Sequence, residues 1–252
     1  MKSLLAVIVM LVLGYFIVQT GIFSMRITRG IKLSESSVPF QHREAQARYR
    51  MLVIGDSTGV GTGVNDPKDS VAGRLFQDFP HGTIENRARN GARFSDVLSQ
   101  LHEAEQDTYD LILIQTGGND ILRFTPLKRL NEQVPSLLKA AKERGRHVIL
   151  MSTGNVGNAP AFFPPFNWIY TTRTRQVRKL LMEVTHREGT IYVDLFMERK
   201  DDPFAQEPER YHAADFLHPG SEGYRLWYEA LRIQVNLTEL LTTPQQGVHP
   251  IF

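Results

Sequence analysis

The sequence contains no cysteine, and the rest of its composition excludes further functions before any motif is considered. Without cysteine there is no disulfide framework, no thiolate nucleophile and no cysteine ligand for a metal. An excess of charge of either sign is also absent, because 29 Lys and Arg residues are balanced by 27 Asp and Glu residues and the formal net charge is +2. A chain this close to neutral lacks the basic surface of nucleic-acid-binding proteins, so we expect no nucleic-acid partner.

Charged residues are absent from residues 3–25, which include the dense apolar run 4–18. A stretch of this kind predicts a membrane segment. A cleaved signal peptide is the main alternative, but no clear small-x-small cleavage site follows the run, and the uncharged stretch extends toward spanning length. We therefore favour a retained transmembrane anchor over residues 1–25, followed by a polar linker over residues 26–48.

The residues that flank the anchor bear on its orientation. Arg26, Arg29 and Lys32 outnumber Lys2 and the amino terminus, and by themselves they would hold the following domain in the cytoplasm. An N-terminal anchor more often places its domain on the other side of the membrane. We expect that arrangement here, with the protein membrane-anchored and its domain periplasmic or extracellular.

The remaining length suits one domain, which we assign to residues 49–241, with residues 242–252 as a C-terminal tail. Short apolar runs alternate there with longer stretches of helical periodicity. The runs lack strict apolar-polar alternation, as expected of strands buried on both faces of a parallel sheet. They are Met51 to Ile54, Thr83 to Asn86, Leu111 to Gln115, His147 to Met151 and Thr190 to Val193. This alternation predicts a three-layer α/β/α sandwich around five parallel strands.

Two of the predicted helices can be placed in more detail. Thr125 is expected to cap the helix between the third and fourth strands, with Pro126 at its first position and a bend at Pro135. The last helix carries Trp227 and Leu231 on an apolar stripe. We expect this stripe to pack in the core.

Polar motifs follow four of the five predicted strands. They are Gly55-Asp56-Ser57-Thr58-Gly59 after the first, Asn90-Gly91 after the second, Gly117-Gly118-Asn119-Asp120 after the third and Asp215-Phe216-Leu217-His218-Pro219 after the fifth. In an open parallel sheet, ligands bind beyond the carboxyl ends of the strands, near the point where strand order reverses. The four motifs therefore indicate a single site.

Ser57 is the candidate nucleophile of that site. A serine hydroxyl needs a base within hydrogen-bond reach, and the base needs a partner that fixes its tautomer. His218 can be the base and Asp215 its partner, because the three-residue spacing lets the carboxylate reach Nδ1 while Nε2 faces the serine. The segment from Asp78 to His81 has the same spacing, but it lies between a helix and a strand, at the opposite edge of the sheet.

Acyl transfer also needs donors for the oxyanion of its tetrahedral intermediate. Gly91 can offer a backbone N–H that no side chain obstructs, and Asn119 can offer an uncharged amide N–H. Either motif alone could be an ordinary turn. Their placement on the same edge as Ser57 favours the functional interpretation.

Together these residues resemble the SGNH hydrolases, the GDSL-type esterases and lipases. The resemblance covers about residues 50–240, and its four blocks match the motifs that contain Ser57, Gly91, Asn119 and His218. It implies a flavodoxin-like sheet, Ser57 as nucleophile, His218 as base and Asp215 as its orienting partner. It further implies an oxyanion hole formed by the N–H groups of Ser57 and Gly91 and the Asn119 side chain, with no metal and no cofactor. The one departure is Thr58, where many members have leucine.

Other interpretations of the same residues fit less well. Residues 55–59 satisfy the Gly-x-Ser-x-Gly elbow of α/β-hydrolases, but in that fold several strands precede the serine, and the acid and the histidine lie in separate loops. Residues 59–63 lack the spacing of a dinucleotide-binding motif, and no Gly-Lys-Ser/Thr follows them.

The sequence thus predicts a serine hydrolase that cleaves carboxylic esters through an acyl-enzyme intermediate. The apolar segment from Ala161 to Phe166 could line an acyl pocket or touch a bilayer, and we expect an apolar acyl group. Two alternatives remain open. One is a carbohydrate O-deacetylase that uses the same catalytic set, and the other is a membrane-tethered glycan-binding module without turnover.

Overall fold

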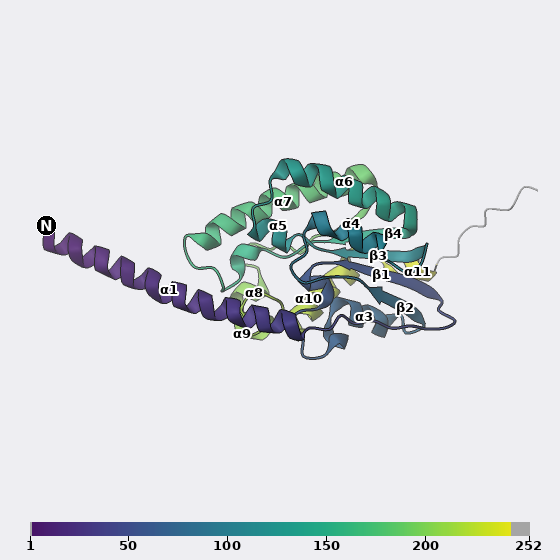
Figure 1. Cartoon of the computed structure of the whole chain (residues 1–252), viewed down its shortest axis with the longest axis horizontal. Coiled ribbons are helices and arrows are strands. Elements are labelled where there is room, and N and C mark those ends of the chain that lie inside the picture. Colours follow the sequence, from purple (N-terminus) through teal and green to yellow (C-terminus); the bar gives the residue numbers. More distant parts are fainter. Residues whose placement is uncertain (1, 243–252) are drawn as a thin grey trace, which may run out of the picture.

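The computed structural model describes residues 2–242, and its centre is a five-stranded parallel sheet in the order β2-β1-β3-β4-β5 (Figure 1). The strands are β1 (Tyr49–Gly55), β2 (Gly82–Asn86), β3 (Tyr109–Gln115), β4 (Gly145–Met151) and β5 (Ile191–Val193). All four neighbouring pairs are parallel. The strand order is that of flavodoxin-like folds, so the predicted fold class is confirmed.

Alternate residues of the strands supply two separate cores, one on each face of the sheet. Met51 and Val53 face one core, whereas Leu52 and Ile54 face the other, and all four side chains are fully buried. Both faces of the sheet are covered, which is why the central strands β1 and β3 contain continuous apolar runs.

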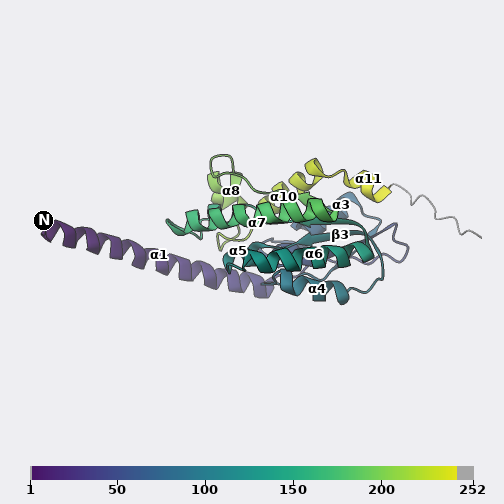
Figure 2. The ribbon, with the colours of Figure 1, turned by 90° about the horizontal axis from the view of Figure 1, so that it is seen from above.

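Helices form the two outer layers (Figures 1 and 2). One face is covered by α3 (Val71–Asp78), α10 (Ser221–Gln234) and α11 (Leu237–Thr242). The other is covered by α4 (Phe94–His102), α6 (Leu127–Arg144) and α7 (Phe166–Glu188). The remaining short elements are α2 (Ser57–Val60), η1 (Pro67–Asp69), α5 (Gly118–Leu122), η2 (Val156–Asn158), α8 (Pro203–Gln206) and α9 (Pro208–Tyr211).

Helix boundaries follow the predictions closely. Pro126 takes the cap position of α6 instead of its first helical position, so the helix begins one residue later than expected from Thr125. Pro135 lies inside α6, and the bend expected at this residue stays a prediction. Trp227 and Leu231 of α10 are buried in the core.

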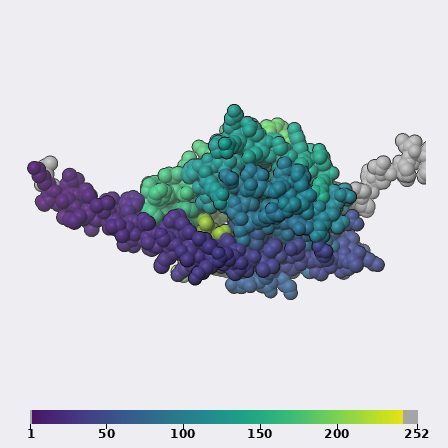
Figure 3. All heavy atoms as spheres, viewed as in Figure 1, coloured from purple at the N-terminus to yellow at the C-terminus, as the bar shows by residue number. Residues whose placement is uncertain are grey.

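The N-terminal helix α1 (Lys2–Ser36) differs from its prediction in where it ends. Residues 26–36, expected to begin a polar linker, continue the helix without a break. Its N-terminal end projects away from the sandwich, while its last turns cross the domain surface (Figures 1 and 3). By its length and apolar composition, α1 is a candidate to cross a membrane, although an N-terminal signal sequence has the same features. Of the predicted tail, residues 243–252 lie outside the described part of the chain.

Candidate active site

The four motifs lie beyond the carboxyl ends of the strands. Ser57 follows β1, Gly91 follows β2 and Asn119 follows β3, while Asp215 and His218 belong to the segment between β5 and α10. The strand order reverses at β1, so this edge contains the switch point at which open sheets bind ligands. All of these residues except Asp215 line one cavity.

Ser57 is held at a sharp change of direction between β1 and α2. Gly55 ends the strand with a φ of 145°, and a Cβ there would lie 1.8 Å from the backbone oxygen of Gln115. Only glycine therefore fits at this position. The Asp56 carboxylate caps α2 by accepting hydrogen bonds from the Thr58 backbone N–H (2.8 Å) and the Thr58 hydroxyl (2.7 Å). The threonine that departs from the family pattern thus stabilises the turn that presents Ser57.

Two hydrogen bonds connect Ser57, His218 and Asp215. His218 Nδ1 lies 2.6 Å from Asp215 Oδ2, and His218 Nε2 lies 2.9 Å from Ser57 Oγ. With Nδ1 protonated, the imidazole donates to the carboxylate and accepts the hydroxyl proton of Ser57. This arrangement can take a proton from the serine and hold the resulting imidazolium beside a negative charge.

The loop that carries the pair is organised by Asp215 itself. Its Oδ1 accepts hydrogen bonds from the backbone N–H groups of Leu217 and His218, each at 3.0 Å. Phe216, the residue directly after Asp215, has a φ of 58°, which residues other than glycine seldom adopt. Burial alone would raise the pKa of Asp215, but the hydrogen bond and charge of His218 and the two backbone donors outweigh it and lower that pKa. Asp215 is therefore kept ionised.

Gly91 and Asn119 both border the cavity. Gly91 has a φ of 77°, in the left-handed region that favours glycine. The neighbouring Asn90 fixes this turn, because its Nδ2 donates to the Ser34 backbone oxygen at 2.8 Å. Asn119 Nδ2 donates to the Ala92 backbone oxygen at 3.1 Å, which orients the amide and leaves its second N–H for another acceptor.

Asp120 has a structural role at this edge of the sheet that the sequence does not predict. Its Oδ2 accepts a hydrogen bond from the Phe94 backbone N–H at 3.0 Å and so ties α5 to the start of α4. Burial raises its pKa. Over residues 2–242, no group of three or more His, Asp or Glu side chains is placed to hold a metal ion.

The cavity beside Ser57 has a volume of about 520 Å³. Its wall is mainly apolar, and several elements contribute side chains to it. They include Leu122, Val156, Leu195, Met197, Leu217, Leu226, Trp227 and Ile233. Trp227 thus belongs both to the core and to the cavity wall, although its helical stripe indicated only the core.

Phe162 and Phe163, which could have lined an acyl pocket, are not among the residues that border this cavity. Phe163 instead contacts Tyr15 and Phe16 of α1, with ring centroids 5.9 and 6.0 Å apart. Phe162 packs on Tyr170 of α7 at 4.3 Å. The acyl-pocket interpretation of these two residues is wrong, because their rings pack on α1 and α7 and do not border the cavity beside Ser57.

The last turns of α1 contact the loop that carries Asp215 and His218, a contact that the sequence does not predict. Arg29 Nη1 donates to the Ala214 backbone oxygen at 3.3 Å. A Cβ at Gly30 would lie 3.1 Å from Asp215 Oδ2, and Ser34 borders the cavity. In Figure 3, late residues of the chain are visible in a hollow beside this part of α1. The one available signal was Gly30, a small residue at which a helix can approach another segment closely.

A family model described as GDSL-like Lipase/Acylhydrolase matches residues 53–226, from within β1 to within α10. The chain belongs to this family. The GDSL match includes every candidate site residue from Ser57 to His218, and the resemblance to the SGNH hydrolases is confirmed. An arylesterase of Vibrio mimicus is 31% identical over 113 residues, which cover 42% of this chain and 56% of that relative. The chain therefore spans little more than half of the length of this curated relative.

Solved structures of GDSL and related proteins share the fold. A lipolytic protein of the G-D-S-L family from Veillonella parvula has a TM-score of 0.58 at 17% identity, covering 74% of this chain and 98% of its own. TesA has a TM-score of 0.58 at 21% identity, with 76% and 99% covered. An acetyl xylan esterase from Geobacillus stearothermophilus has a TM-score of 0.53 at 19% identity, with 75% and 94% covered.

Proposed function

We propose that this GDSL protein is a serine esterase that hydrolyses carboxylic esters with an apolar acyl group. The observation that carries the proposal is the hydrogen-bonded chain from Asp215 through His218 to Ser57, which opens into a mainly apolar cavity. Family membership and the arylesterase relative support ester hydrolysis.

Acylation begins when Ser57 Oγ attacks the carbonyl carbon of the ester and gives its proton to His218 Nε2. Asp215, ionised and bonded to Nδ1, stabilises the imidazolium that forms. His218 then donates the proton to the departing alkoxide, leaving an acyl group on Ser57. A water molecule, deprotonated by the same histidine, releases the acid and restores the serine.

The negative oxygen of each tetrahedral intermediate needs donors that are already in place. We assign this role to the backbone N–H groups of Ser57 and Gly91 and to the Asn119 amide. The hydrogen bond from Asn119 to Ala92 supports the assignment, since it fixes the amide before substrate arrives. A single donor of this kind is typically worth a factor of about 100 to 1000 in rate.

The Ser57→Ala variant tests the chemistry. Hydrolysis of p-nitrophenyl butyrate by the full-length protein should fall by about 10⁴-fold or more, because the nucleophile is gone. The matched control is Ser95→Ala, which removes an exposed hydroxyl from the start of α4 and should leave the rate unchanged. Turnover retained in Ser57→Ala would contradict the proposed function.

Acyl preference separates the esterase from the carbohydrate O-deacetylase. The proposal predicts that kcat/KM rises from acetyl to octanoyl p-nitrophenyl esters, since each buried CH₂ contributes about 0.8 kcal/mol. A strict preference for acetyl groups, with faster release of acetate from acetylated glycans, would support the deacetylase instead. No turnover of any ester would favour a glycan-binding module.

We also propose that α1 is retained as a membrane anchor, with the domain on the periplasmic or extracellular side. Ser34 borders the cavity and lies about 12 Å beyond Arg26 along the helix axis, so a membrane ending near Arg26 would hold the site close to its surface. Membrane fractions should contain the full-length chain, and protease should digest its domain in sealed right-side-out vesicles. A chain that lacks α1, or a domain protected from protease, would contradict this arrangement.

A further inference from the structure

The loop before α7 and the first turns of that helix carry apolar side chains that the domain does not cover. Phe166 is 43% exposed, Trp168 65% and Ile169 45%. No Asp, Glu, Lys, Arg or His occurs between His147 and Arg173, which is the longest such interval in the sequence. Scattered exposed apolar residues need no explanation, but a contiguous group without charges indicates an interaction surface.

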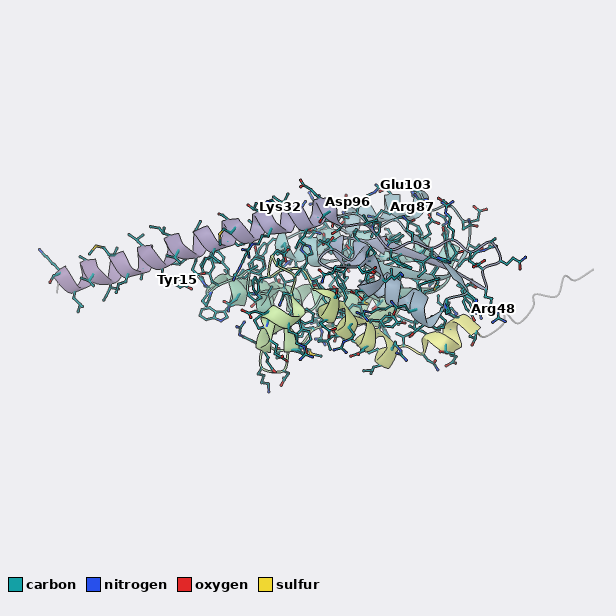
Figure 4. The ribbon with its side chains drawn as sticks, turned by 90° about the horizontal axis from the view of Figure 1, so that it is seen from below. Tyr15, Lys32, Arg48, Arg87, Asp96 and Glu103 are labelled. Atoms are coloured by element: carbon teal, nitrogen blue, oxygen red, sulfur yellow. The ribbon has the colours of Figure 1, made fainter. Side chains whose placement is uncertain are left out.

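This surface lies against the apolar half of α1. Phe163 contacts Tyr15 and Phe16, and on its other side it packs edge-on against Phe166, with ring centroids 5.3 Å apart. Figures 1 and 2, from perpendicular directions, both show the start of α7 beside α1. Figure 4 labels Tyr15 where α1 passes this end of the domain. We call Phe163, Phe166, Trp168 and Ile169 the aromatic platform.

The position of the aromatic platform along α1 can be compared with the membrane surface. The dense apolar run ends before Gln19, and the first charge after it is Arg26, so the surface of a bilayer crossed by α1 should meet the helix between these residues. Tyr15 lies about 6 Å before Gln19 and about 16 Å before Arg26 along the axis. At either limit, the residues that Phe163 contacts are below the membrane surface.

We propose that the aromatic platform inserts into the membrane, in the leaflet on the side where the domain lies. The proposal rests on the proposed anchor, and it commits to lipid as the occupant of this surface. Tryptophan and phenylalanine beside the charge-free residues 3–25 of α1 are suited to the boundary between headgroups and acyl chains. The domain would then touch the bilayer at two places, α1 and the aromatic platform.

Insertion at two places would fix the direction in which the active site faces. Arg26 donates a hydrogen bond to the Pro160 backbone oxygen, and its guanidinium lies 4.9 Å from the Phe216 ring centroid. The Ala161 backbone N–H donates to the Phe216 oxygen at 3.2 Å. The loop of the aromatic platform is therefore hydrogen-bonded directly to the loop that carries Asp215 and His218.

Tryptophan fluorescence tests insertion without relying on catalysis. The chain has two tryptophans, Trp168 and the buried Trp227. The fluorescence emission of wild type minus that of Trp168→Phe therefore reports on Trp168. In full-length protein reconstituted into phosphatidylcholine vesicles, lipids with brominated acyl chains should quench this difference emission. Aqueous iodide should not.

The contrary outcomes separate the aromatic platform from the anchor. Failure of the protein to float with the vesicles would contradict the anchor and, with it, the aromatic platform. Flotation with Trp168 emission quenched by iodide, and not by brominated lipid, would overturn the aromatic platform alone. Quenching by neither reagent would also overturn it, because a second copy or another protein would then cover Trp168.

A charge placed in the aromatic platform gives a second test. Trp168→Lys should reduce hydrolysis of a long-chain ester embedded in vesicles by about tenfold, because a buried charge in lipid is costly. It should leave hydrolysis of soluble p-nitrophenyl acetate unchanged. Met182→Lys is the matched control, since Met182 is 41% exposed on the same helix but about 21 Å further along its axis. Equal effects of both substitutions on the embedded ester would contradict the proposal.

Discussion

The chain contains two Asp-x-x-His segments, and their different surroundings show what residue spacing cannot decide. Asp78 ends α3 and His81 immediately precedes β2, at the amino edge of the sheet. Asp215 and His218 follow β5, at the carboxyl edge, where His218 reaches Ser57. The edge of the sheet on which an Asp-x-x-His segment lies therefore decides whether its histidine can reach Ser57, and the spacing alone does not.

The carboxylates of the two segments have different partners. Asp78 accepts a hydrogen bond from the Tyr228 hydroxyl at 2.8 Å and pairs with Arg232 at 3.4 Å, so it fastens α3 to α10. Asp215 is buried, and its partners are the ring and backbone of His218 and the backbone of Leu217. We expect substitutions in the first segment to affect stability and substitutions in the second to affect rate.

The largest difference is expected between the two histidines. His218→Ala should lower kcat for p-nitrophenyl butyrate by about 10⁵-fold, because loss of the base leaves the serine protonated. His81→Ala removes the histidine of the other segment and should leave kcat within about twofold of wild type. Comparable losses of kcat in the two variants would contradict the conclusion that only His218 acts on Ser57.

Substitutions of the two aspartates should affect different properties, the rate for Asp215 and the stability for Asp78. Asp215→Asn should lower kcat by about 10⁴-fold with little loss of stability, because the amide favours the wrong tautomer of His218. Asp78→Asn should leave kcat near wild type and lower the free energy of unfolding by about 1 to 2 kcal/mol. Urea denaturation and kinetics on the same preparations check both statements, and a large rate loss in Asp78→Asn would contradict them.

The stability of the protein should also depend on pH through His212, which lies on the same loop as Asp215 and His218. Burial lowers the pKa of His212 to about 4 from an ordinary 6.5. Its contribution to stability is therefore complete above pH 6.5 and is lost as pH falls toward 4, where the unfolded chain binds a proton that the folded chain does not. The loss should amount to about 2 to 3 kcal/mol.

His212→Gln cannot titrate and serves as the control for this prediction. Its free energy of unfolding should change less between pH 7 and pH 4.5 than that of wild type. An identical pH dependence in the two proteins would show that His212 is not held neutral by the fold.

The smallest expected effect concerns the contact between α1 and the second segment. Gly30→Leu should lower kcat by about tenfold, since a side chain there would press on Asp215. Gly21→Leu is the control, because a Cβ at Gly21 meets nothing within 4 Å. Equal kcat values for both variants would mean that α1 does not influence the loop that carries Asp215 and His218.

Much of the fold could be predicted because local patterns determine it. The central strands β1 and β3 contain uninterrupted apolar runs, and each predicted run overlaps an observed strand. Strand boundaries shifted by one or two residues, since polar ends such as Arg50 and Asp110 still pair in the sheet. The gathering of the four motifs followed from the geometry of parallel sheets.

The contacts of α1 could not be predicted, because they depend on how two distant segments dock. Residues 26–36 are polar enough to suit a linker, yet they are helical and contact the loop that carries Asp215 and His218. The same docking takes Phe163 to the apolar half of α1 instead of the cavity. Trp227 reaches the cavity because α10 borders it, which a helical stripe alone does not reveal.

The central claim is that Ser57, activated by the second segment, is the nucleophile. A fluorophosphonate probe tests it directly, because serine attack at phosphorus expels fluoride and leaves a stable adduct whose position peptide mass spectrometry can identify. The account predicts an adduct on Ser57 in wild type and in His81→Ala, and none in His218→Ala. An adduct on a different residue, or equal labelling of Ser57 in His218→Ala, would contradict it.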